Sequence, residues 1–148
     1  MDQVDFACNR RSNSVIRFRE FRNTDPPALT KLWNQGIPGT AMARPLRTHE
    51  LDAHAFGSVT FDPQGLIVAE RDGEIIGFVH AGFGPEDTTS DSTPYRLGRS
   101  IGTIAMLMVV DDVTDSDVER ELILQAEVYL RNQGAQVIYI GGQKPLNP

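Results

Sequence analysis

The chain has little cysteine, no excess of positive charge and no long apolar run. Cys8 is the only cysteine among 148 residues, which excludes an internal disulfide and favours a reducing compartment. The 14 Lys and Arg against 20 Asp and Glu give a net charge of −6, which argues against general nucleic-acid binding. No apolar stretch reaches the roughly 18 residues of a membrane helix, and the N-terminus lacks a signal-peptide core. We therefore expect a cytoplasmic protein that binds neither nucleic acid nor membrane.

The sequence also lacks a recognisable metal-binding pattern. Its histidines are His49, His54 and His80, and the first two are five residues apart, so they do not share one helix face. The acidic segment 111–121 lacks the glycine and glutamate spacing of an EF-hand loop. We therefore predict no metal site.

The length and a 40% apolar content fit one domain that folds without a disulfide or metal. Residues 1–14 mix charged and small polar residues without periodicity and predict a mobile tail, so the domain covers residues 15–148. A strand from Val15 to Phe21 is followed by a helix that begins at Asp25 and ends at Gly36.

The middle of the chain predicts a short helix and then a hairpin. Within residues 39–65 we expect a helix capped by Thr48 with Leu51 on its inner face. Two apolar runs between Leu66 and Phe83 flank Asp72-Gly73, a strong signal for a hairpin turn. The polar segment 84–100 is predicted to be a loop.

The last third of the chain predicts a strand, a helix and a strand. The segment 101–110 is apolar on both faces, as a central strand is. A helix runs from the Ser116–Glu119 capping box to Gly134, and a strand at 136–140 places Tyr139 in the core. The two strands should be parallel, which gives an α/β fold with a mixed sheet: an antiparallel meander followed by a βαβ unit.

This order of elements resembles the GNAT N-acetyltransferase superfamily. The pieces that carry the resemblance are IRFREFRNTDPPALTKLWN, LIVAERDGEIIGFVHAGFG, and MLMVVDD followed by a helix and QVIYIGG. The resemblance spans Val15 to Pro148. It implies a bulge in the central strand at Leu107–Val110 that splays this strand from the next one, with acetyl-CoA in the cleft between them.

The resemblance also implies how the site works. Backbone groups at Met108, Val109 and Val110 would bind the pantetheine arm and polarise the thioester carbonyl. An amine would attack that carbonyl directly, so no nucleophilic side chain is required and no catalytic residue is assigned. His80 borders the expected cleft and is a candidate general base, although a packed core histidine is the commoner role for such a residue.

The phosphate-binding signature of the family, R/Q-x-x-G-x-G/A, falls on residues 115–120. This alignment makes Ser116, Val118 and Arg120 the expected cofactor-binding positions, and neither glycine is present. Six acidic residues and a single Arg occupy 111–121. Because carboxylates stand where phosphate should bind, we expect acetyl-CoA to bind weakly through this loop.

The ending KPLNP resembles the start of the next GNAT helix, where Asn147 matches an asparagine that contacts CoA. The usual tyrosine, the rest of that helix and the closing strands are absent from the sequence. We therefore expect either a following domain or a homodimer that covers the edge of residues 136–140.

Two classes of function remain open from the sequence. The first is an N-acetyltransferase that moves acetyl from acetyl-CoA to a primary amine of a small molecule or peptide. The second is a catalytically inactive GNAT-like interaction module, or the degenerate half of a tandem acetyltransferase.

Overall fold

The structure is a computed structural model that describes residues 15–35, 45–51, 53, 56–57, 60–85, 97–110 and 116–141. The predicted tail 1–14, His54 and Asn147 lie outside these residues. The elements, in chain order, are β1 (Ile16–Glu20), α1 (Pro26–Gln35), α2 (Thr48–Leu51), the 3-10 turn η2 (Pro63–Gly65), β2 (Leu66–Arg71), β3 (Glu74–Pro85), β4 (Leu97–Val109), α3 (Ser116–Asn132) and β5 (Val137–Ile140).

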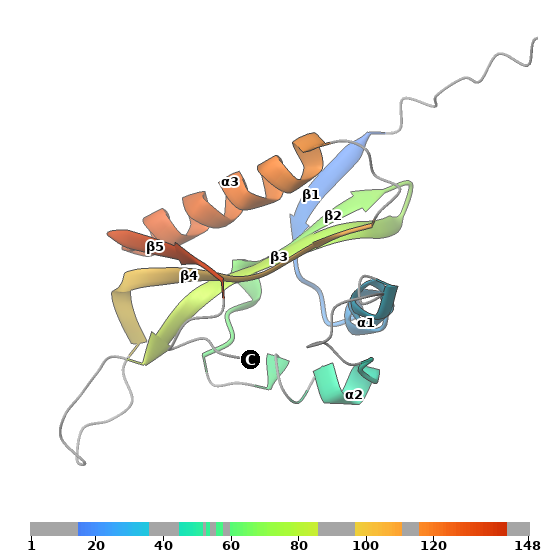
Figure 1. The fold of residues 1–148 in the computed structure, drawn as a ribbon, viewed down its shortest axis with the longest axis horizontal. Coiled ribbons are helices and arrows are strands. Elements are labelled where there is room, and N and C mark those ends of the chain that lie inside the picture. Colours follow the sequence, from blue (N-terminus) through green and yellow to red (C-terminus); the bar gives the residue numbers. More distant parts are fainter. Residues whose placement is uncertain are drawn as a thin grey trace, which may run out of the picture.

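The five strands form one mixed sheet in the order β1-β2-β3-β4-β5. The first three pairings are antiparallel, and β4 pairs with β5 in parallel across the α3 crossover. Helix α3 covers one face of the sheet, and α1 and α2 lie on the other (Figure 1). The predicted α/β fold, with a meander followed by a βαβ unit, is confirmed.

The hairpin between β2 and β3 turns at the predicted dipeptide. Asp72 and Gly73 have φ angles of 53° and 85°, the left-handed values that a tight hairpin turn requires at both central positions. Arg71 and Glu74 pair directly across the turn.

Each face of the sheet carries its own apolar core. On the α3 face, Val118, Leu122, Ala126 and Leu130 recur at helical spacing and pack on the sheet. On the other face, the predicted inner residues Leu29, Leu32 and Leu51 pack against β2 and β3, and all three are buried. Among the described residues, no helix is long and apolar enough to cross a membrane.

Two sequence-based expectations about the strands are wrong. Strands β3 and β4 include residues 84–85 and 97–100 of the segment predicted as a loop, since Pro85 pairs with Leu97 and extends the ladder, while residues 86–96 lie outside the described ranges. Tyr139 is 44% exposed rather than in the core. Its neighbour Ile138 packs toward α3, and successive side chains of a strand alternate between faces, so Tyr139 points to the opposite face.

Candidate functional site

Strands β4 and β5 separate halfway along β4. Their last paired residues are Ile104 and Ile140, and the Gly141 N–H donates to the Ile104 carbonyl at 2.9 Å. Strand β4 continues to Val109, and no described strand pairs with this second half on the side away from β3. Within the described residues, the second half of β4 therefore has an unpaired backbone edge on this side, which we call the open edge, while the splaying of the two strands stays a prediction.

A β-bulge lies at the point where the two strands part. His80 pairs with Met106 and Ala81 with Ile104, so Ala105 is the extra residue of β4. The side chain of Ile104 faces α3, whereas Met106 and Met108 pack toward α1 and α2. The bulge thus lies before the predicted segment Leu107–Val110, because the one-residue insertion occurs where the parallel pairing ends.

The register of β3 and β4 decides which backbone groups face the open edge. The Val110 N–H donates to the Ile76 carbonyl at 2.9 Å, and the same register pairs Met108 with Phe78. The backbone N–H and C=O groups of successive residues in an antiparallel strand point alternately to its two sides. Those of Met108 and Val110 therefore bond to β3, and those of Leu107 and Val109 point to the side away from β3. Sequence reasoning missed Leu107, because only the register distinguishes it from its neighbours.

The first turn of α3 lies next to the end of β4 and carries exposed acids. Asp117 and Glu119 are exposed, as is Arg120. Val118 is 2% exposed and packs in the core on this face. A glycine at Val118 would therefore remove a core side chain, and the phosphate-binding role of this turn stays a prediction. The side chain of Ser116 lies outside the described part of the chain.

A groove of about 710 Å³ runs along α1, on the opposite face of the sheet from α3. We call it the α1 groove. Its walls are α1, the β2–β3 hairpin and the end of β4, and it is lined by Arg19, Thr24, Asp25, Ala28, Lys31, Leu32, Gln35, Arg71, Gly73, Glu74, Ile75, Ile76, Val109 and Val110.

Arg19 lines the α1 groove and links β1, which carries it, to β2 and to the start of α1. Its Nη1 and Nη2 atoms donate to the Asp25 carboxylate at 2.8 and 3.0 Å, and its Nε donates to Glu70 at 2.8 Å. The hydrogen bond to Asp25 contributes most to raising the pKa of the Arg19 guanidinium. The Asp25 carbonyl accepts the first α1 bond from Leu29, as predicted, while its carboxylate binds Arg19 and the Arg22 N–H.

His80 is a buried residue on the α1 face of β3. It is 7% exposed, its ring centroid lies 5.6 Å from that of Phe61, and its Nδ1 has no hydrogen-bond partner. Burial lowers its pKa from 6.5 to about 4, so the ring is neutral near pH 7. Within the described ranges, no three His, Cys, Asp or Glu side chains gather as metal ligands.

The burial of His80 predicts a specific pH dependence of stability. The unfolded chain takes up a proton near pH 6.5, whereas the folded chain does so only near pH 4. Stability from this residue is therefore complete above pH 6.5 and falls by about 3 kcal/mol as the pH decreases to 4. Urea unfolding across this range should show that loss in the wild type and not in His80→Gln. Equal pH slopes for the two proteins would contradict the assignment.

Comparisons with known proteins agree with this geometry. The model of the Acetyltransferase (GNAT) family matches residues 18–148. A mycothiol acetyltransferase from Cellulomonas flavigena is 31% identical over 85 residues, which are 56% of this chain and 24% of that protein. The chain thus spans only about a quarter of the length of that relative.

Solved structures share the fold at low identity. A GNAT family acetyltransferase from Brucella melitensis in complex with acetyl-CoA superposes with a TM-score of 0.66 at 15% identity, covering 89% of this chain and 79% of that one. An aminoglycoside N-acetyltransferase in complex with CoA gives 0.62 at 16% identity, covering 91% and 81%. With the family match over nearly the whole domain, these findings establish that the chain belongs to the GNAT acetyltransferase family.

Proposed function

We propose that this chain transfers an acetyl group from acetyl-CoA to a primary amine of a small molecule or peptide. The observation that carries the proposal is the end of the β4–β5 pairing at Ile104 and Ile140, beyond which the backbone groups of Leu107 and Val109 face no strand of the described structure. The relatives support the same class. Two of the solved neighbours are complexes with acetyl-CoA or CoA, and one of these is an aminoglycoside N-acetyltransferase.

The open edge of β4 suits the acetyl thioester of this co-substrate. The acidic first turn of α3 suits its phosphates less well. Acetyl-CoA, when bound, supplies the acetyl thioester. The N–H groups of Leu107 and Val109 are fixed by the sheet and can donate to an oxygen that becomes negative during the reaction. His80, with a pKa of about 4, is a weak base, so we assign it no catalytic role.

Ligand-dependent stability and acetyl transfer together test the proposal. Acetyl-CoA should raise the melting temperature, and a concentration 100 times its Kd would stabilise the fold by roughly 2.7 kcal/mol. The release of free CoA should depend on an added primary amine. If acetyl-CoA neither stabilises the chain nor acetylates any amine in a broad panel, the proposal fails and an interaction module accounts better for the chain.

The acids of the first α3 turn predict which change improves co-substrate binding. Asp117 and Glu119 are exposed in the first turn of α3, so a phosphate group held by this turn would be repelled by both. Each charge at a helix N-terminus is worth about 0.3–1 kcal/mol, so Asp117→Asn with Glu119→Gln should tighten acetyl-CoA binding roughly three- to thirtyfold. Isothermal titration calorimetry at low salt would measure this gain.

The matched control for this change is Glu127→Gln. Glu127 lies on the same helix, more than two turns beyond the first turn, so its removal should leave the affinity unchanged. An equal gain from Glu127→Gln would mean that the effect arises from net charge rather than from the phosphate position.

A further inference from the structure

Strand β1 is the outer strand of the sheet, and one of its backbone edges has no partner in the described structure. The sheet order places β1 at one end, and β2 is the strand that pairs with it. The Phe21 N–H, just beyond β1, donates to the Leu66 carbonyl of β2 at 2.9 Å. Because successive residues of an antiparallel strand point their N–H groups alternately to its two sides, those of Phe18 and Glu20 point outward. A further extended segment can bond to this edge.

A groove of about 530 Å³ lies between this edge and the outer side of α3. We call it the β1–α3 groove. Its apolar lining consists of Phe18 and Ile67 from the sheet and Leu124 and Val128 from α3. Leu124 is 43% and Val128 58% exposed, and their spacing of four residues puts them on one side of the helix. Exposed apolar side chains next to an unpaired strand edge suit the side chains of an added strand.

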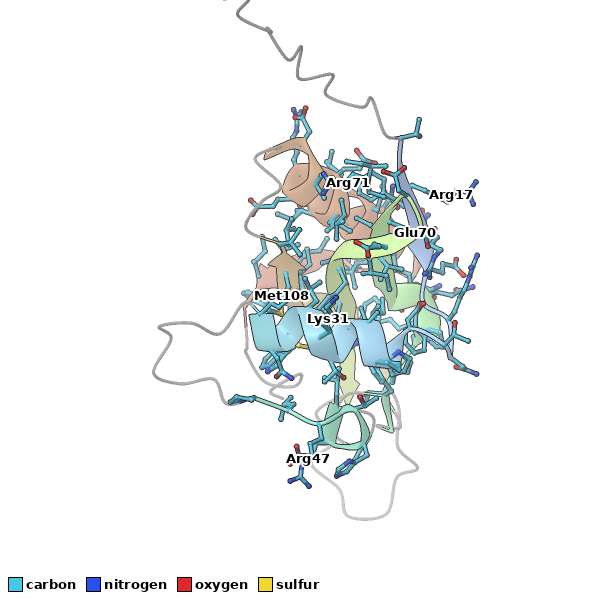
Figure 2. All side chains as sticks on the ribbon, turned by 90° about the vertical axis from the view of Figure 1, so that its right-hand side faces the viewer. Arg17, Lys31, Arg47, Glu70, Arg71 and Met108 are labelled. Carbon is cyan, nitrogen blue, oxygen red and sulfur yellow. The ribbon has the colours of Figure 1, made fainter. Side chains whose placement is uncertain are left out.

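The two faces of β1 differ in charge. Phe18 packs into the core on the α3 face, and alternation puts Arg17 and Arg19 on the other face. The Arg19 charge is balanced by Asp25 and Glu70, whereas Arg17 is exposed and forms no ion pair with a described residue. Figure 2 shows the Arg17 side chain extending outward from β1 at the right-hand margin of the molecule. A strand added to this edge would thus meet an apolar groove on one face and an unpaired cation on the other.

The register of β1 decides where an acidic side chain of the added strand should lie. The backbone of Arg17 bonds to β2, so a residue opposite it on an added antiparallel strand would form a non-hydrogen-bonded pair, in which side chains approach most closely. Opposite charges in such a pair stabilise the sheet, and like charges destabilise it. The residues before and after this position would point to the α3 face. The preferred segment therefore has an acidic residue between two apolar ones.

A second copy of this chain fits the edge poorly. Antiparallel pairing of β1 with itself about Phe18 would put Arg17 of each copy opposite Arg19 of the other. Like charges directly opposite each other destabilise a pair of strands. Because β1 has only five residues, few other pairs are present to offset this repulsion. The charge of the edge therefore favours an acidic partner over a second β1.

We propose that the free edge of β1 and the β1–α3 groove bind an extended peptide segment of a partner protein. The segment adds to the sheet as an antiparallel strand, with an acidic residue opposite Arg17 and with apolar residues on either side of it entering the groove beside Leu124 and Val128. This surface lies at the opposite end of the strand order from β4 and β5. Binding of the partner therefore leaves the open edge of β4 free for acetyl transfer, and the inference goes beyond the proposed function.

The test uses three fluorescently labelled peptides with blocked ends. The first is Thr-Thr-Val-Glu-Val-Thr-Thr, the second has Lys in place of Glu, and the third has Pro in place of the second Val. Fluorescence anisotropy with the full chain should show about fivefold tighter binding of the Glu peptide than of the Lys peptide. The Pro peptide should bind about tenfold more weakly than the Glu peptide, because it lacks an N–H that bonds to β1.

Two variants locate the peptide on this surface. Arg17→Glu should reverse the preference, so that the Lys peptide binds more tightly than the Glu peptide. Val128→Asp, at an exposed position of the groove, should weaken binding of the Glu peptide about fivefold. Arg47→Glu is the matched control. It makes the same charge change at an exposed position near α2, well away from β1 in Figure 2, and should leave both affinities unchanged.

Several results would overturn the proposal. They are no binding of any peptide at about 1 mM, equal binding of the Glu and Lys peptides, and an unchanged preference in Arg17→Glu. A Pro peptide that binds as tightly as the Glu peptide would mean that no strand is added. A wild-type dimer in light scattering that Val128→Asp dissociates would assign the surface to a second copy instead. Arg17→Glu should leave CoA release unchanged, so these outcomes do not depend on the acetyltransferase function.

Discussion

Replacing Arg19 with methionine should lower the free energy of unfolding by about 3–5 kcal/mol. The Asp25 side chain is only 5% exposed and forms two hydrogen bonds with the guanidinium. The variant leaves that carboxylate without its ion-pair partner in a buried position, and it also removes the side-chain hydrogen bonds that link β1 to Glu70 of β2 and to the start of α1. Urea unfolding followed by circular dichroism would measure the loss.

Two further variants show whether the loss comes from the buried charge. Arg17→Gln removes an exposed cation from the same strand and should change stability by less than about 0.5 kcal/mol. Adding Asp25→Asn to Arg19→Met should recover part of the stability, since the unpaired charge is then gone. Fully additive losses in the double variant would contradict a coupled pair.

Alanine at Gly65 should destabilise the fold by about 3 kcal/mol or more. A Cβ atom there would overlap the Ala81 carbonyl oxygen and lie 2.9 Å from Cε1 of Tyr129. The backbone oxygen belongs to the central sheet and has little freedom to move. The clash would also disturb the Tyr129 hydroxyl, which donates to Asp62 at 2.8 Å and joins α3 to the η2 turn. Thermal unfolding would measure the effect.

Gly73→Ala is the control for this second variant. Gly73 has a positive φ of 85°, but no atom lies within 4 Å of an added Cβ. Its replacement should therefore introduce backbone strain of only about 1 kcal/mol. If Gly65→Ala destabilises the fold no more than Gly73→Ala does, the close approach of η2 to β3 is wrong.

Local patterns in the sequence were sufficient for most of the fold. The Asp72-Gly73 turn, the start of α3 at Ser116 and its end at Gly134 each depend on a few neighbouring residues, and each is confirmed. Gly134, for example, has a φ of 109°, as a helix-ending glycine does. Such features follow from backbone conformational preferences that act over one or two turns.

The site depends on relations that local patterns do not contain. Residues 101–110 are apolar on nearly every position, so no alternation reveals where Ala105 bulges or that Leu107, rather than Met108, faces the open edge. Arg19 bonds to Glu70, which lies 51 residues away along the chain, and to Asp25 at the start of α1. Only the pairing register and the packing of α1 establish these relations.

The shortness of β5 has a consequence for the order in which the domain opens. In the part of the chain that the structure describes, its strand partner is β4 alone, through four pairs, and three of its four residues are more than 40% exposed: Val137, Tyr139 and Ile140. The meander β1 to β4, by contrast, is joined by longer antiparallel ladders. Partial unfolding should therefore begin by release of β5, at a free energy well below that of global unfolding. The second wall of the cleft is thus the element that fluctuates first.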